Sequence, residues 1–312
     1  MGELFDKLAN YGNSGIYPFH MPGHKRQKTV DFNPYKIDIT EIEGFDNLHH
    51  AEGVLLEAQK KAEKLYGSEE SHFLINGSTA GILSAVSACA KKTVLIARNC
   101  HKAVYHAALI RNLDVYYVYP EIQEEFMLNG GINPADVERS LEEHPEIEAV
   151  VITSPTYDGI VSDVKRIAEI AHAHKKPLIV DEAHGAHFRY HKGFPVSALD
   201  LGADVVIQSL HKTLPAFTQT SILHVKGDLV DRERLEHYLQ IFQSSSPSYL
   251  FMAGMERCLR FMEEGKGTEE GMTGGRSMMD QFYHRLVKLR KELGAMKHLR
   301  LLEEDQKGKN GV

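Results

Sequence analysis

Apolar residues follow two alternating patterns along the chain. Residues 51–67 carry them at helical spacing, and Gly67 is a typical helix stop, so we predict a helix that ends there. Beyond it, short apolar runs typical of buried strands alternate with longer helical segments. The predicted strands are residues 72–75, 93–97, 114–119, 148–153, 177–184, 204–209 and 221–225.

The connections between these strands predict how the sheet is built. Most of them are helical and long enough to return each strand parallel to the last, whereas 221–225 follows too soon for a crossover helix and is expected to be antiparallel. Continuous apolar strands need helices on both faces. We therefore predict an α/β fold, a three-layer sandwich around a mostly parallel seven-stranded sheet.

The remaining segments suggest three units in a chain of 312 residues, long enough for roughly two domains of about 150 residues. Residues 1–50 are rich in Gly, Pro, His and Asn and predict an extended arm. Residues 51–264 form the major domain and finish with two helices from 231 onward. A Gly-rich connector leads to 276–312, which begins a second, smaller domain.

The composition and the lengths of the apolar runs argue against several classes of protein. Lys and Arg total 36 against 43 Asp and Glu, which argues against general nucleic-acid binding. The apolar runs are too short to span a membrane, and the first residues lack the apolar core of a signal peptide. Three cysteines, Cys89, Cys100 and Cys258, are too few for a disulfide framework. We expect a cytoplasmic protein.

Ligands of open α/β sheets bind at the carboxyl ends of the strands. The first predicted strand ends in residues 76–81, NGSTAG, where helix amides and two hydroxyls suit a phosphate, although a Ser or Thr helix cap is the commoner use. The second strand leads to His101, which can stack on a flat ring or be an ordinary loop histidine. The fourth leads to the hydroxyl-rich turn 153–159.

The next two strand ends carry a sharper signal. Asp181 follows three apolar residues and needs a cation or a donor, so a structural ion pair is one explanation. Lys212 stands beside Ser209 and His211, and a lysine in a closed site can lose its proton and attack a carbonyl.

Together these groups suit one ligand, pyridoxal 5′-phosphate (PLP). Asp181 would hold the ring nitrogen, His101 would lie against the ring, and Lys212 would form a Schiff base with the aldehyde. The phosphate would be held by Ser78, Thr79, Ser209 and His211.

The motifs FHMPGHK, INGSTAG, RNCHKAVYHA, TSPTYDG, DEAHGAH and SLHKT occur in this order between about residues 15 and 260. In this respect the chain resembles the bacterial ornithine/lysine/arginine decarboxylase family. The resemblance implies PLP dependence and an aspartate-aminotransferase-like fold (PLP fold type I), with most of a C-terminal small domain missing. It also implies a homodimer or larger homo-oligomer in the cytoplasm.

The resemblance also assigns residues to the cofactor. It makes Lys212 the Schiff-base lysine, pairs Asp181 with the pyridine nitrogen and stacks His101 on the ring. It places His184 near the phenolic oxygen or the substrate. The cofactor-binding set it implies is Gly77, Ser78, Thr79, His101, Thr156, Asp181, His184, Ser209, His211 and Lys212.

The expected reaction is decarboxylation of arginine, lysine or ornithine to an amine and CO2, consistent with a role in polyamine biosynthesis. The alternatives are a PLP-dependent aminotransferase or β-eliminase, and an inactive truncated homologue. A basic substrate needs acidic groups, for which Glu41, Glu43 and Asp46 are candidates; a solvated acidic arm is the other explanation.

Residues 181–191 also suggest two other functions. His184, His187 and His191 lie within one short segment, which raises a metal-dependent hydrolase, but HExxH is missing and we expect no metal. Residues 181–184 also match a helicase box, yet the GxxxxGK[ST] loop that an ATPase needs does not occur.

Overall fold

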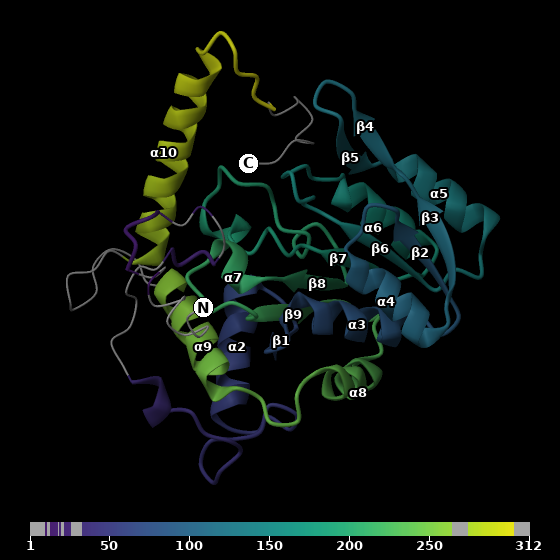
Figure 1. Cartoon of the computed structure of the whole chain (residues 1–312). Coiled ribbons are helices and arrows are strands. Elements are labelled where there is room, and N and C mark those ends of the chain that lie inside the picture. Colours follow the sequence, from purple (N-terminus) through teal and green to yellow (C-terminus); the bar gives the residue numbers. More distant parts are fainter. Residues whose placement is uncertain are drawn as a thin grey trace.

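A computed structural model describes residues 33–263 and 274–302, with residues 10, 13–17, 19 and 22–25 of the arm. Its centre is a seven-stranded sheet of order β1-β9-β8-β7-β6-β2-β3 (Figure 1). The strands of this sheet are β1 (Glu70–Leu74), β2 (Thr93–Ala97), β3 (Asp114–Val118), β6 (Ala149–Thr153), β7 (Leu178–Asp181), β8 (Val205–Gln208) and β9 (Ser221–Val225).

The strand directions agree with the sequence prediction. The strands from β8 to β3 pair in parallel, and β9 is antiparallel to both β8 and β1. Asp181 in β7 pairs with Thr153 in β6 and Ile207 in β8. The seven predicted strands and the reversed direction of 221–225 are therefore confirmed, although the run predicted as 177–184 is a strand only over Leu178–Asp181.

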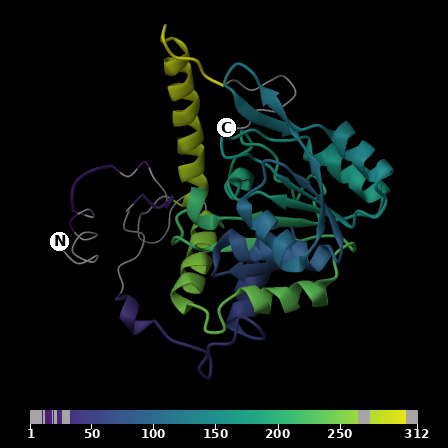
Figure 2. The same ribbon diagram turned by 45° about the vertical axis from the view of Figure 1, so that its right-hand side comes forward.

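Helices cover both faces of the sheet, as the continuous apolar strands require (Figure 2). One core cluster joins the sheet to α3 (Gly77–Cys89), α4 (Lys102–Arg111) and α8 (Arg232–Phe242). The other joins it to α2 (Val54–Tyr66), α5 (Pro134–Glu143), α6 (Val164–Ala173) and α9 (Tyr249–Glu263). The short helices are η1 (Pro34–Lys36), η2 (Phe188–Tyr190) and α7 (Leu210–Thr213).

Two glycines explain local features that place the site. Gly67 ends α2 in the left-handed conformation, φ +67°, and its amide bonds to Glu63, as predicted. Gly81 lets α3 lie close to the sheet, because a Cβ there would stand 2.6 Å from Cδ1 of Leu74. The N-terminus of α3 is thereby held against the end of β1.

A two-stranded antiparallel sheet was not predicted. It consists of β4 (Pro120–Gln123) and β5 (Leu128–Ile132) and follows β3 (Figure 1). The first strand begins with proline and the second contains Gly130 and Gly131, residues that are depleted in strands. The run predicted as 114–119 accordingly ends at Val118.

The last described helix, α10 (Gly275–Gly294), stands apart from the sheet in both views (Figures 1 and 2). Gly275 at its start lies against Met262 of α9. Farther along, the Tyr283 ring lies where a Cβ at Gly193 would be, and it stacks on His191 at 4.1 Å. No helix among the described residues is long and apolar enough to cross a membrane. The domain boundaries at 50, 264 and 276 stay a prediction.

Candidate active site

Asp181 and Lys212 come from neighbouring strand ends. Asp181 closes β7, and β8 runs through Ser209 into α7, which carries Lys212; the Ser209 amide donates to Ala183 O at 3.3 Å. Burial raises the pKa of Asp181, which is 4% exposed, while the Lys212 charge holds the increase back. Burial lowers the pKa of Lys212, and the negative charge of Asp181 opposes this decrease. The two side chains therefore interact electrostatically in a partly dehydrated place.

Three hydroxyls converge at the N-terminus of α3. Ser78 Oγ lies 2.7 Å from Ser209 Oγ and 3.2 Å from Ser221 Oγ. The helix begins at Gly77, φ +71°, after Asn76 at the N-cap position. Asn76 does not cap it, because its Oδ1 accepts from the Ser244 amide at 3.0 Å. Uncapped helix amides beside hydroxyls are a suitable anion site.

The alternative that Ser78 or Thr79 caps this helix does not fit, since both lie inside its first turn. Ser221 was missed by the sequence analysis. It begins β9, and because β9 is antiparallel its start lies at the same sheet edge as the carboxyl ends of the parallel strands. The sequence feature that could have indicated Ser221 is a hydroxyl at the start of the strand predicted to be antiparallel.

His101 is fixed by the helix that follows it. It is the N-cap of α4, and its Nδ1 accepts from the Ala103 amide at 3.2 Å. Burial lowers the pKa of His101. The negative charge of Asp181 opposes this decrease, and the positive charge of Lys212 increases it. His101 is thus near both residues of the central pair, and its capping role sets the orientation of the ring.

His184 and His211 belong to the same electrostatic neighbourhood. Burial lowers the pKa of His184 to about 4, helped by Lys212, His101 and His211, so its imidazole is neutral near pH 7. The Tyr157 ring meets His184 edge-on at 5.7 Å. His211 uses Nδ1 to bond the Thr220 carbonyl at 2.8 Å, which makes Nδ1 the protonated nitrogen.

The early arm motif reaches the lysine helix. The Gly23 amide donates to the His211 carbonyl at 2.8 Å, and a Cβ at Gly23 would be 2.7 Å from Leu214 O. Only a residue without a side chain allows this approach. Gly23 therefore packs against the C-terminal end of α7.

Thr156 is committed to its own turn. Its Oγ1 accepts from the Ile160 amide at 3.1 Å, and its amide donates to Ile160 O at 2.8 Å. A contact between Thr156 and a cofactor stays a prediction. By contrast, two buried threonine hydroxyls have no hydrogen-bond partner among the described residues. They are Oγ1 of Thr153, which pairs with Asp181 across the sheet, and Oγ1 of Thr213, which follows Lys212. Both are donors that a bound molecule would satisfy.

The three acidic candidates of the arm differ from one another. Asp46, at φ +69°, accepts from the backbone amides of Asn47, Glu52, Gly53 and Leu55 at 2.8–3.1 Å. Burial would raise its pKa, but these amides bring it below the usual value. Asp46 therefore anchors the chain entering α2. Glu43 is exposed, and Glu41 Oε1 is buried without a hydrogen-bond partner in the described part of the chain.

The histidines considered as metal ligands make aromatic contacts in different places. His187 packs edge-on against Phe188 and Phe194, and His191 stacks on Tyr283. Within the described ranges, no three His, Cys, Asp or Glu side chains gather as a metal site would require.

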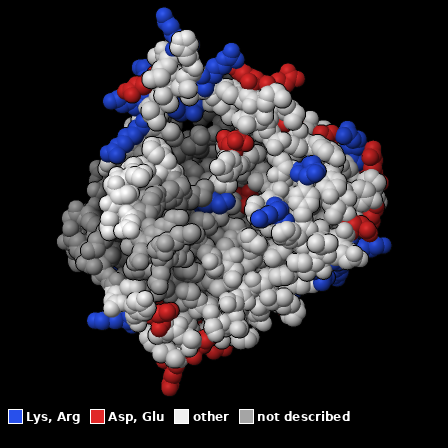
Figure 3. Space-filling model, in the orientation of Figure 1, with Lys and Arg blue, Asp and Glu red and all other residues white. Residues whose placement is uncertain are grey.

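The face drawn in Figure 1 is hollowed beside α10, as the space-filling view shows (Figure 3). Basic and acidic atoms are both visible inside the hollow, whereas much of the surrounding surface is uncharged.

Known proteins resemble this chain over most of its length. The family model described as Orn/Lys/Arg decarboxylase, major domain, matches residues 3–307. An uncharacterised protein of Bacillus subtilis (strain 168) is 42% identical over 264 residues, covering 81% of this chain and 55% of that protein. Arginine decarboxylase of the same organism is 33% identical over 263 residues, covering 81% and 54%. The chain spans about half the length of these relatives.

Solved structures share the fold. The constitutive lysine decarboxylase of E. coli superposes with a TM-score of 0.69 at 23% identity, over 93% of this chain and 43% of that one. Lysine decarboxylase A of Pseudomonas aeruginosa gives 0.71 at 22% identity, over 96% and 44%. These likenesses confirm the predicted fold. The family match covers nearly the entire sequence, and the chain belongs to the Orn/Lys/Arg decarboxylase family.

Proposed function

We propose that this chain is the PLP-binding part of a decarboxylase that acts on a basic amino acid. The observation that carries the proposal is the pairing of a buried acid, Asp181, at the end of β7 with a partly buried lysine, Lys212, in the helix that follows the neighbouring strand β8. A buried carboxylate is costly unless it meets a cation, and the protonated ring nitrogen of PLP is one.

The donor set fits this cofactor. Ser78, Ser209 and Ser221 surround the uncapped N-terminus of α3, where the three phosphate oxygens would find hydroxyls and amides. The unsatisfied hydroxyl of Thr213 adds a donor beside Lys212. Thr79 and His211 complete the proposed phosphate set, and His101 and His184 the proposed ring contacts.

Each residue then has a definite task. Asp181 would keep the ring nitrogen protonated, and Lys212, whose lowered pKa increases its neutral fraction, would offer its amine to the aldehyde. When bound, PLP withdraws electrons from a bond to the α-carbon of an amino acid. The fixed His101 ring would cover one face of the cofactor and limit the access of water.

The substrate class is proposed from the relatives, which include arginine decarboxylases. A basic side chain needs a carboxylate that is available to it. Asp46 is occupied by backbone amides, so Glu41, with its unsatisfied buried oxygen, is the better candidate of the arm. Arginine, lysine and ornithine stand as the candidate substrates.

Purified protein mixed with PLP tests the proposal. We expect a visible absorbance band that borohydride removes, with the added mass on the peptide carrying Lys212. Lys212→Ala should lack the band, and Lys192→Ala, at an exposed lysine, should keep it. Labelled CO2 from carboxyl-labelled arginine, lysine or ornithine supports decarboxylation; a keto acid product points to transamination, and ammonia release to β-elimination. No band at any PLP concentration would refute the proposal.

A homodimer is proposed on the exposed aromatic residues of the arm. Phe19 is 91% exposed and Tyr35 86% exposed, the two highest values among the large apolar side chains that the structure describes. A second copy of the chain could cover them. Light scattering after size-exclusion chromatography, compared with Phe19→Ser, would detect the dimer and its weakening.

A further inference from the structure

A second buried acid lies directly beside Asp181. Glu182 is 1% exposed and directly follows β7. Its contact with Gln208 places its side chain on the face of the sheet opposite Asp181, because Gln208 alternates with Ile207, the residue that pairs with Asp181. Burial raises its pKa to about 7, although its hydrogen bonds favour the charged form. The three donors that contact it are neutral groups, so this carboxylate is expensive to bury.

The contacts of Glu182 connect two strand ends. Its Oε2 accepts from Gln208 Nε2 at 2.6 Å and from Ser197 Oγ at 2.8 Å, and its Oε1 accepts from the Ala198 amide at 2.7 Å. Gln208 is the last residue of β8 and immediately precedes Ser209. The side-chain bond therefore joins the end of β7 to the end of β8.

The surrounding backbone holds Glu182 in this position. Its amide donates to Ile207 O at 3.0 Å, across the same pair of strands. The chain then turns closely over the side chain, since a Cβ at Gly185 would be only 2.5 Å from Glu182 Cγ. The carboxylate is thus fixed from β8 on one side and from the following loop on the other.

We propose that Glu182 is a positioning residue: by holding Gln208, it sets the separation of Asp181 and Lys212 that the cofactor must bridge. This inference rests on the proposed function. Glu182 touches no reacting atom, because it acts from the far face of the sheet through the ends of β7 and β8.

Asp204 provides a matched control. It is also buried, at 3% exposure, and joins the same two strands at their opposite ends. Its Oδ2 accepts from the Leu178 amide at 2.8 Å and lies 2.9 Å from His172 Nε2. Asp204→Asn should destabilise the fold at the edge that is remote from Lys212.

The variants are Glu182→Gln, Gln208→Glu and the double variant that combines them. Each single change places like groups opposite each other, two amides or two carboxylates, whereas the double variant restores one of each. Hydrogen exchange without cofactor is the first measurement. We expect faster exchange in peptides covering 181–184 and 207–213 for the single variants, and recovery in the double variant. Asp204→Asn should instead affect 176–180 and 203–206.

Binding of PLP, followed by absorbance, is the second measurement. Each single variant should raise the Kd about tenfold or more, the double variant should recover most of this, and Asp204→Asn should leave the Kd near the wild-type value. Equal effects of Glu182→Gln and Asp204→Asn on the Kd, or exchange at 207–213 that no single variant changes, would overturn the inference. Failure of the wild-type chain to bind PLP would refute the proposed function, and the exchange data would still decide whether Glu182 orders the strand ends.

Discussion

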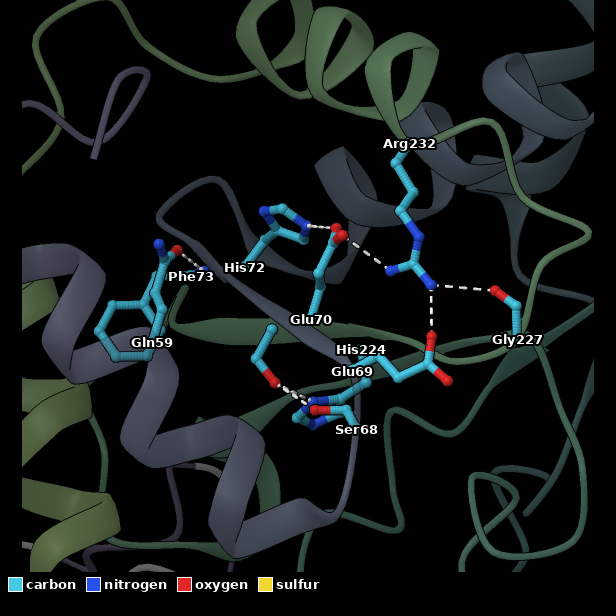
Figure 4. Close-up of polar contacts among 10 residues, drawn as sticks. Gln59, Ser68, Glu69, Glu70, His72, Phe73, His224, Gly227 and Arg232 are labelled. Atoms are coloured by element: carbon cyan, nitrogen blue, oxygen red, sulfur yellow. Dashed lines mark hydrogen bonds and ion pairs between the residues drawn. The ribbon is translucent and has the colours of Figure 1, made fainter. Parts of the chain in front are cut away.

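The side-chain amide of Gln243 bonds to the backbone of Ile75, with Oε1 accepting from its amide at 2.9 Å. The Nε2 of the same side chain donates to Phe73 O at 3.4 Å. From the other side, Gln59 Oε1 accepts from the Phe73 amide at 2.9 Å (Figure 4). Strand β1 is at the edge of the sheet, so these amides take the place of a further strand. They also fix the residues that lead into α3.

Gln243→Glu tests this arrangement, because a carboxylate keeps the acceptor for Ile75 but loses the donor to Phe73. We expect the free energy of unfolding in urea to fall by about 1–3 kcal/mol, the usual cost of a lost buried hydrogen-bond partner. Gln240→Glu is the control, at an exposed position of α8 just before its C-cap Gln243; it loses only a solvent-exposed bond to His49 O and should change the free energy of unfolding by no more than about 0.5 kcal/mol. Equal losses in the two variants would contradict the interpretation.

The hydroxyl cluster at α3 predicts which part of a ligand is recognised. Ser78→Ala removes the hydroxyl that links Ser209 and Ser221, and should raise the Kd for PLP about tenfold. Pyridoxal, which has no phosphate, should bind Ser78→Ala and wild type equally. Ser84→Ala is the control, since the Ser84 hydroxyl donates to Ala80 O within the same helix at 2.8 Å. An equal loss for pyridoxal would show that the cluster does not act on the phosphate.

His224 predicts a pH dependence of stability. It is fully buried in β9, with Nδ1 2.7 Å from Ser71 Oγ, which in turn contacts Ser68 (Figure 4). Burial lowers its pKa from 6.5 to about 3. Between these values the unfolded chain binds more protons than the folded one, so stability is lost as the pH falls below 6.5.

His224→Asn keeps a polar partner for Ser71 and removes the titration. Between pH 7 and pH 5 the wild type should lose about 2 kcal/mol more than the variant, measured by urea unfolding at each pH. Ser71→Ala retains the buried imidazole and should keep the wild-type slope. Parallel pH profiles for wild type and His224→Asn would show that another group is responsible.

The sheet could be predicted because its strands are uninterrupted apolar runs and because one connection is too short for a crossover. The β4–β5 sheet could not, since Pro120, Gly130 and Gly131 disguise its strands. Asp181 and Lys212 were found because charged residues at strand ends are costly without a partner.

Other roles depended on the folded loops. Asp46 looked available for a substrate, but its carboxylate is enclosed by backbone amides that only the turn before α2 brings together. Glu182 was visible in the sequence, yet its function depends on Gln208 and Ser197, which pair with it across the sheet and a loop. Pattern alone does not contain such contacts.

Because β9 is antiparallel to its neighbours, three contacts of the candidate site come from the short stretch of chain at its start. Gln219 Nε2 bonds Ile75 O, the Thr220 carbonyl orients His211, and Ser221 completes the hydroxyl cluster. Inserting or deleting a single residue between α7 and β9 would displace all three anchors together. A change of length there is therefore far less tolerable than in the β4–β5 turn, where no described residue bonds to His211 or to the hydroxyl cluster.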